Sequence, residues 1–276
     1  MDEENRRIRY RILDPTGNIT ALVESPVAPA RQPAVAERLM ARHREVEQVG
    51  FLTPAPEGAG VSAVLRMAGG EFCGNASLCA AALLLPAGAG ESAVLRLRVS
   101  GAAEPVAVSL TRETADSFSG FVVMPPALAV EEARFACGSL AGTLPVVCME
   151  GISHVIVEEN SPFFALLADR PAAERAVKDW CAQLGADGLG LMFLSGAEAE
   201  MRLTPLVYVP GSGTVFWENS CASGSAAVGR YLARQSGAPA ELALRQPGGT
   251  LRVACDPAGD CRLYGRVRLV GEYEGV

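Results

Sequence analysis

The sequence predicts an α/β protein of two similar domains, residues 1–127 and 128–276. Strand-like runs of alternating or β-branched residues recur along the whole chain and are separated by Pro, Gly or Ser, while only a few segments have helical spacing. In addition, a cysteine followed by small residues at the start of a helix occurs once in each half. Together these observations favour one supersecondary unit used twice.

The N-terminal half consists mainly of short strands with two helices. Helices are expected at Ala34–Glu45 and at Asn75–Leu85, where Pro86 stops the second one. Strands are expected at Ile8–Leu13, Ile19–Glu24, Val46–Leu52, Val61–Met67, Ala93–Val99, Val106–Thr111 and Gly120–Met124.

The C-terminal half repeats this plan after a join near "MPPALAVEE", residues 124–132. Helices are expected near Arg170–Leu184 and Ala222–Gln235. Strands are expected at Leu144–Cys148, Ser153–Glu158, Gly190–Leu194, Met201–Val209, Glu241–Arg245, Thr250–Ala254 and Arg262–Val270. The last strand could pack back on the N-terminal domain.

Composition and charge narrow the function. With 276 residues, 49% of them hydrophobic, the chain can build two full cores. Its 31 acidic and 24 basic residues give a net charge of −7, so the positive surface of a nucleic-acid-binding protein is missing. We expect a small-molecule partner, no nucleic acid and no membrane, with a homodimer as an open option.

The expected location is the cytoplasm. The N-terminal stretch "MDEENRRIRYRIL" is charged and has no apolar signal region, and the longest apolar run, residues 80–89, contains Pro86 and is too short to cross a membrane. Eight cysteines without a secretory signal predict reduced thiols rather than a disulfide framework.

Neither a metal nor another cofactor is expected. The only histidines are His43 and His154, and the close cysteine pairs are spaced C-x5-C rather than C-x2-C. The chain also has no P-loop and no G-x-G-x-x-G after a strand, which are the usual marks of nucleotide cofactors.

The repeated pattern aligns "CGNASLCAAALL" with "CASGSAAVGRYL". Cys73 then matches Cys221, Ser77 matches Ser225 and Leu84 matches Leu232. Each stretch follows a strand and opens a helix, so two domains that face each other across a cleft would bring both cysteines to one place.

This placement suits proton transfer at an amino acid. The free N–H groups and the dipole at a helix start favour a thiolate, and the small residues Gly74, Asn75, Ala222 and Ser223 leave amides uncovered for a carboxylate. The substrate α-carbon would lie between the two sulfurs. One thiolate could remove the α-proton while the opposite thiol protonates the other face, which inverts the centre without a cofactor.

A structural interpretation competes with this chemistry, because free cysteine is among the most buried residue types. We keep it for Cys79, Cys137, Cys148, Cys181, Cys255 and Cys261. For Cys73 and Cys221 the paired context favours catalysis.

Neighbouring polar residues also have two interpretations. Glu71 and Glu218 could contact a substrate ammonium, or could simply suit a helix start. Asn18 could line the cleft or serve a turn after Gly17. His154, on an expected strand, is interpreted as a core histidine or one behind the site rather than a base.

The motifs "GGEFCGNAS", "ENSCASGSAA", "DPTGNITALV" and "QPGGTLRV" resemble diaminopimelate epimerases, proline racemases and their relatives over most of the chain. This resemblance implies a strongly curved, mostly antiparallel sheet around a central helix in each domain, an active site between the domains, and a racemase that uses two thiols and no pyridoxal phosphate.

The resemblance also implies roles for individual residues. Cys73 and Cys221 match the acid and base thiols, and Gly74 with Asn75, like Ala222 with Ser223, matches the positions that hold the α-carboxylate. Asn18 matches an asparagine of the family's N-terminal segment, and His154 matches the histidine of its "GNPH" segment.

Departures from the family pattern bear on the substrate. Ile152 and Gly190 stand where diaminopimelate epimerases have asparagines, and "PGSG", residues 210–213, replaces their Glu-Arg pair. Without that arginine, the second carboxylate of a substrate such as diaminopimelate has no bidentate partner. The histidine racemases are a closer match, so we expect a substrate with one carboxylate such as histidine, with diaminopimelate as the alternative.

Other functions stay open at this point. "EFCGNASLCAAALL" also resembles phenazine-biosynthesis-type isomerases of the same fold, in which a carboxylate replaces the two thiols and a histidine would occupy position 75. A non-catalytic amino-acid-binding protein and a thiol redox protein are further alternatives.

Overall fold

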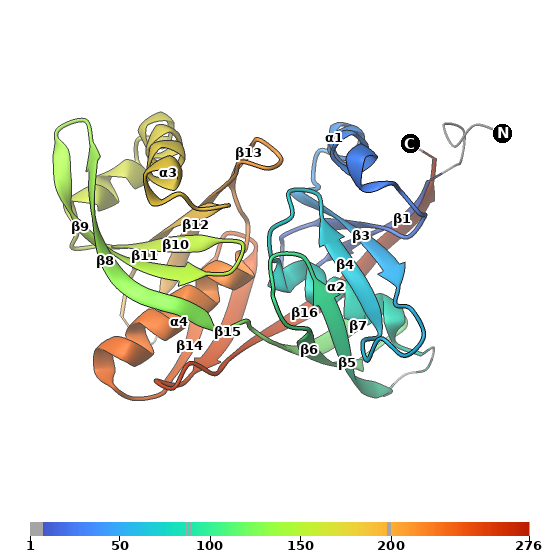
Figure 1. The fold of residues 1–276 in the computed structure, drawn as a ribbon. Helices are drawn as coiled ribbons and strands as arrows, with labels where there is room; N and C mark the ends of the chain where they lie inside the picture. Colours follow the sequence, from blue (N-terminus) through green and yellow to red (C-terminus); the bar gives the residue numbers. More distant parts are fainter. Residues whose placement is uncertain (1–7, 87, 89, 198–199, 276) are drawn as a thin grey trace.

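The computed structural model describes residues 8–86, 88, 90–197 and 200–275. Two lobes lie side by side, one formed by the N-terminal half and one by the C-terminal half, and the last strand, β16, extends from one to the other (Figure 1). The fold-class prediction, an α/β protein with curved sheets around central helices, is confirmed.

The N-terminal lobe holds helix α1 (Gln32–Arg42) and helix α2 (Gly74–Leu84). A short 3-10 helix, η2, spans Pro29–Arg31. The strands of the N-terminal lobe are β1 (Arg9–Asp14), β2 (Thr20–Val23), β3 (Gln48–Pro54), β4 (Ala63–Met67), β5 (Ser92–Val99), β6 (Val106–Arg112) and β7 (Ser117–Val123).

The C-terminal lobe holds the 3-10 helix η3 (Pro162–Leu167), helix α3 (Arg170–Leu184) and helix α4 (Ala222–Ser236). Its strands are β8 (Ala127–Cys137), β9 (Leu140–Met149), β10 (Ser153–Glu158), β11 (Leu189–Ser195), β12 (Arg202–Val209), β13 (Thr214–Trp217), β14 (Ala240–Gln246), β15 (Gly249–Cys255) and β16 (Cys261–Glu274).

The last strand closes the N-terminal sheet into a barrel. The strand order runs from β1 to β7 and then to β16, and β16 also pairs with β1. The start of β16 pairs with β15 as well, so a single long strand belongs to both lobes. This double pairing holds the two lobes together.

Helix α2 runs inside the barrel. It contacts β2, β5, β6, β7 and β16, and its residues 74–82 are all buried. The helix carries small and apolar side chains on every face, as expected of a helix enclosed by a sheet.

Helix α4 has the corresponding place in the C-terminal lobe, where the sheet runs in the order β15, β14, β12, β11, β10, β9 and β8. It contacts strands at both ends of that sheet, including β8 and β15, so the sheet curves around it. Helix α3 packs on the other face through a separate core that includes Trp180, Phe135 and Phe163.

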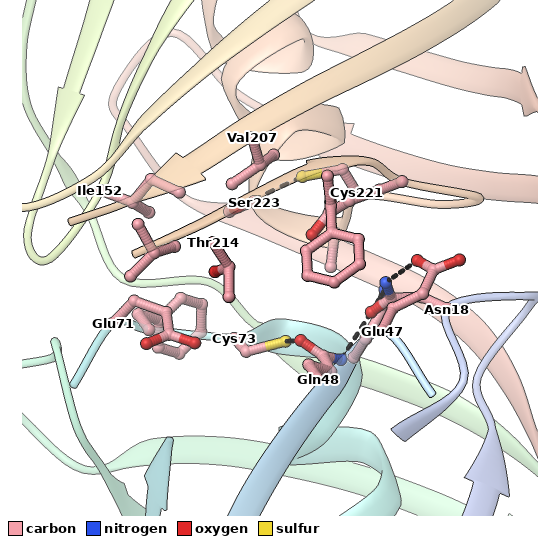
Figure 2. A pocket seen from close by; sticks show the side chains of 16 residues that line it. Asn18, Glu47, Gln48, Glu71, Cys73, Ile152, Val207, Thr214, Cys221 and Ser223 are labelled. Atoms are coloured by element: carbon pink, nitrogen blue, oxygen red, sulfur yellow. Dashed lines mark hydrogen bonds between the residues drawn. The ribbon is translucent and has the colours of Figure 1, made fainter. Parts of the chain in front are cut away.

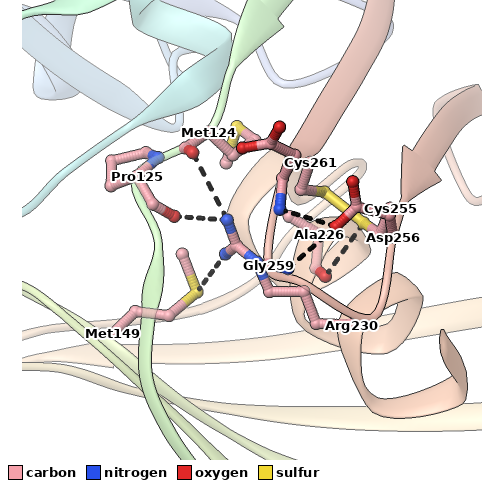
Figure 3. The surroundings of a disulfide bond; sticks show 10 residues. Met124, Pro125, Met149, Ala226, Arg230, Cys255, Asp256, Gly259 and Cys261 are labelled. Carbon is pink, nitrogen blue, oxygen red and sulfur yellow. Dashed lines mark hydrogen bonds between the residues drawn. A yellow bond between two sulfur atoms is a disulfide. The ribbon is translucent and has the colours of Figure 1, made fainter. Parts of the chain in front are cut away.

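A buried arginine of α4 lies at the junction of the lobes. Arg230 is 4% exposed and donates to the carbonyl oxygens of Met124, at 3.3 Å, and of Pro125 (Figure 3). Its other terminal nitrogen lies 3.6 Å from the Met149 sulfur. Arg230 therefore fastens α4 to the segment that connects β7 to β8.

Most of the expected elements form, and α3 has the expected bounds, Arg170–Leu184. Two strands were not expected. β8 occupies much of the segment interpreted as a join, because Ala127 onward pairs with β9, and β13 follows the turn at residues 210–213 and pairs with β12.

The prediction of reduced cysteines is wrong for one pair. Cys255 and Cys261 form a disulfide, whereas Cys73, Cys79, Cys137, Cys148, Cys181 and Cys221 are free (Figure 3). The two bonded residues are direct partners at the end of the β15–β16 pairing, with Cα atoms 4.1 Å apart. The C-x5-C spacing, which in the sequence argues only against a metal site, is the spacing of this hairpin.

Candidate active site

A pocket lies between the lobes, and its empty volume, including the part open to solvent, is about 530 Å³. Both halves of the chain contribute to it. The lining residues are Asn18, Glu47, Gln48, Glu71, Phe72, Cys73, Asn75, Ile152, Val207, Val209, Thr214, Phe216, Glu218, Cys221, Ala222 and Ser223.

The two cysteines cap the two central helices. Cys73 has extended backbone before α2, and its sulfur accepts from the Ala76 N–H at 3.4 Å. Cys221 does the same before α4, where its sulfur accepts from the Gly224 N–H at 3.3 Å. Figure 2 shows the two cysteines on opposite sides of the pocket.

Aligned serines reinforce the two helix starts. The Ser77 hydroxyl donates to the Cys73 carbonyl oxygen at 2.8 Å, and the Ser225 hydroxyl donates to that of Cys221 at 2.6 Å. The sequence alignment of the two motifs therefore corresponds to the same local structure in both lobes.

The first residues of the helices face each other. A Cβ atom added to Gly74 would lie 3.0 Å from the Cβ of Ala222, so these helix starts are in contact across the junction. The backbone N–H groups of Gly74, Asn75, Ala222 and Ser223 belong to first turns and have no acceptor inside their helices. Of these residues, Asn75, Ala222 and Ser223 line the pocket and Gly74 does not, and N–H groups of such first turns are donors suited to an anion.

The Cys73 thiol is held by a neutral partner. It donates to the Gln48 side-chain oxygen at 3.0 Å. Burial raises the pKa of Cys73 to about 12, although the Ala76 N–H acts in the opposite direction. The helix-start N–H group thus favours the thiolate of Cys73, but the cost of burying the charge exceeds its contribution.

The Cys221 thiol has an ionisable neighbour instead. Burial raises its pKa well above the ordinary value, and the charge of Glu218 raises it further. Burial also raises the pKa of Glu218 to about 8, while its hydrogen bond with Cys221 lowers it. The thiol at this side of the pocket thus lies beside a carboxyl group that can change protonation near neutral pH.

Asn18 lines the pocket rather than serving only a turn. Its side-chain oxygen accepts from Gln48 at 2.5 Å and from Asn75 at 3.2 Å, and its NH₂ group donates to Glu47 at 2.6 Å. The Asn75 side chain also donates to the Ser220 carbonyl oxygen of the other lobe at 3.2 Å. Both asparagines are buried, and together they connect the two halves behind the thiols.

His154 lies behind Ser223, as the sequence interpretation expects. It is fully buried, and its Nε2 atom lies 3.1 Å from the Ser223 hydroxyl. Burial, followed by the charge of Arg230, lowers the pKa of His154 to about 3. The imidazole is therefore neutral at ordinary pH and orients Ser223, whose hydroxyl is 3.6 Å from the Cys221 sulfur.

Several lining residues were missed from the sequence, above all Glu47 and Gln48. Gln48 is the first residue of β3, which pairs with β2 so that Gln48 is opposite Thr20, and Glu47 directly precedes this strand. The sequence offered one signal for them, because two adjacent polar residues stand where a strand of mostly buried residues begins. Thr214 and Phe216 were missed together with their strand, β13.

Other candidate groups are absent from the described ranges. No cluster of three or more His, Cys, Asp or Glu side chains suited to a metal ion occurs among these residues. Within the same residues, no helix combines the length and the apolar character that a membrane span needs.

The family model of the histidine racemase CntK N-terminal domain matches residues 7–272. A histidine racemase from Fusobacterium nucleatum subsp. nucleatum is 30% identical over 240 residues, covering 84% of this chain and 83% of the relative. A histidine racemase from Staphylococcus aureus (strain Mu50) is 27% identical over 248 residues, covering 89% and 88%.

Among solved structures, a probable proline racemase from Agrobacterium radiobacter K84 superposes with a TM-score of 0.71. The match covers 98% of this chain and 93% of the other, at 14% sequence identity. At that identity the likeness establishes the fold alone.

Proposed function

We propose that the chain, which belongs to the family of the histidine racemase CntK N-terminal domain, racemises histidine through Cys73 and Cys221. It is an isomerase that acts on amino acids. One observation carries the proposal. Two cysteines cap two helices whose first residues touch, and both sulfurs line the same pocket from opposite sides (Figure 2).

The helix starts provide a site for the α-carboxylate. The N–H groups of Gly74, Asn75, Ala222 and Ser223 would hold the carboxylate while the α-carbon lies between the sulfurs, and the contact between the two helix starts supports this assignment. When the α-proton leaves, negative charge moves onto the carboxylate, and these fixed donors stabilise it.

The partners of the two thiols suggest complementary roles. Gln48 cannot take a proton from Cys73, which therefore serves as the acid. Glu218 is an ionisable acceptor for the Cys221 proton, and the transfer costs energy because burial holds the pKa of the thiol above that of Glu218. The Cys221 thiolate then removes the α-proton, and the Cys73 S–H protonates the opposite face, leaving Cys221 as a thiol and Cys73 as a thiolate for the reverse direction.

The charge of the pocket supports a basic substrate. Its described lining includes Glu47, Glu71 and Glu218 and no Lys, Arg or His. A carboxylate at the far end of diaminopimelate would therefore face carboxyl groups instead of a cation. The ammonium and imidazole groups of histidine are complementary to the same surface.

The phenazine-type alternative has less support. It requires a carboxylate to act in place of the thiols and makes both helix-capping cysteines accidental, although each lines the pocket. The free thiols of Cys73 and Cys221 support a cytoplasmic enzyme, because a reducing compartment keeps such thiols available, whereas the Cys255–Cys261 disulfide is a bond that such a compartment disfavours. A homodimer is compatible with this proposal.

An amino-acid panel in deuterated water tests the function. Exchange of the α-proton is followed by NMR and inversion by chiral chromatography, with histidine, diaminopimelate, proline and alanine at equal concentrations. We expect exchange and inversion with histidine. Turnover of diaminopimelate without turnover of histidine would overturn the substrate assignment.

A further inference from the structure

The three carboxyl groups of the pocket have different surroundings. Glu47 accepts from Asn18 at 2.6 Å and from the backbone and side-chain nitrogens of Asn219. Glu218 is adjacent to the Cys221 thiol. Glu71 alone among them has a side-chain oxygen, Oε2, that is shielded from solvent and has no hydrogen-bond partner within the described residues.

The backbone around Glu71 is held firmly. The Ser100 hydroxyl donates to the Glu71 carbonyl oxygen at 2.8 Å. A Cβ atom on Gly151 would lie 3.2 Å from the backbone nitrogen of Phe72, the next residue, so neighbouring loops pack closely against this segment. Glu71 is thus presented to the pocket by a constrained turn, two residues before Cys73.

The position of Glu71 separates it from the other acidic groups. In Figure 2 it lies on the opposite side of the pocket from Asn18 and Glu47, on the side of Ile152 and Thr214. Burial raises the pKa of its carboxyl group, while the backbone N–H groups of Glu71 and Gly69 and the charge of Arg66 lower it. A substrate group that donates a hydrogen bond or carries positive charge would remove this cost.

We propose that Glu71 binds an imidazole N–H group of the substrate and so selects histidine over amino acids with neutral side chains. This inference rests on the proposed function. The α-carbon must lie between Cys73 and Cys221, and Glu218, beside Cys221, is engaged with the proton of that thiol. Glu47 is held by Asn18 and Asn219, so Glu71 is the remaining carboxyl group that lines the pocket.

The test uses Glu71→Gln in the full-length chain. This change keeps the size of the side chain and removes its charge. Because a hydrogen bond to a charged group is stronger than one to a neutral group, we expect KM for histidine to rise about 10- to 100-fold with little change in kcat. Glu57→Gln, which neutralises an exposed glutamate outside the pocket, is the control and keeps the parental values.

N-methylated histidines identify the contact directly. Methylation of the nitrogen that donates to Glu71 should raise KM of the parent protein about as much as Glu71→Gln does, whereas methylation of the other nitrogen should have a smaller effect. Glu71→Gln should lose this discrimination. The parent measurements stand even if the variant folds poorly, which thermal unfolding would reveal.

The outcomes are separable. A parent protein that racemises no histidine refutes the proposed function. A parent that racemises histidine but does not distinguish the two methylated forms, or a folded Glu71→Gln with unchanged KM, refutes the role of Glu71 alone.

Discussion

Gly74, the first residue of α2, lies against Ala222, the first residue of α4, so closely that a Cβ at position 74 would be 3.0 Å from the Ala222 Cβ. The same added atom would be 3.2 Å from the sulfur of Met124, whose carbonyl oxygen binds Arg230. The distance between the two thiols depends on this contact, because each cysteine immediately precedes one of the touching residues.

Gly74→Ala should therefore impair catalysis more than folding. Alanine favours the helix by about 1 kcal/mol, which offsets much of the crowding, so we expect a change in unfolding free energy of about 1 kcal/mol or less. A slight separation of the helix starts should nevertheless lower kcat/KM at least about tenfold. Steady-state racemisation and chemical denaturation measure the two effects.

A compensating change controls this experiment. Ala222→Gly removes the Cβ that opposes position 74, so the double variant Gly74→Ala/Ala222→Gly should recover part of the lost activity. No recovery would indicate that the contact does not set the geometry of the site.

Glu218 should produce the acidic limb of the pH–rate profile. Its pKa is raised to about 8, and only the ionised carboxylate can accept the Cys221 proton, so kcat/KM should rise with pH through about 8. Glu218→Gln should lower kcat by about 10²-fold or more and remove that limb. An unchanged profile in the variant would exclude Glu218 as the proton acceptor.

Titration of His154 should change the stability of the protein at acid pH and should not change its catalysis. The folded-state pKa of His154, about 3, is below the unfolded value of 6.5, so its contribution to stability is present above pH 6.5 and is lost as pH falls toward 3. Relative to His154→Gln, the parent should lose about 1 to 2 kcal/mol between pH 7 and pH 5. Denaturation at several pH values measures this, and parallel curves for the two proteins would contradict it.

The strand and helix pattern could largely be predicted because local periodicity determines it. The same is true of the two cysteine motifs, whose small residues leave the helix starts open. Strand β8 was missed since its alternation follows two prolines that resemble a linker, and only the pairing with β9 reveals its extent.

The residues around the thiols could be predicted only in part. Asn18 carried a motif, whereas Gln48 reaches Cys73 through the pairing of β2 with β3, a relationship that the linear sequence does not express. The protonation of Cys73 likewise depends on burial, which outweighs the local effect of the helix start. Long-range packing therefore decides what local motifs leave open.

The most direct test of the two-thiol account follows α-proton exchange and inversion of both histidine enantiomers in deuterated water for the parent, Cys73→Ser and Cys221→Ser. Inversion should fall by about 10³-fold or more in both variants, because each lacks the acid or the base for one face. Any remaining exchange should favour opposite enantiomers in the two variants. Inversion at the parental rate in either variant would contradict the account.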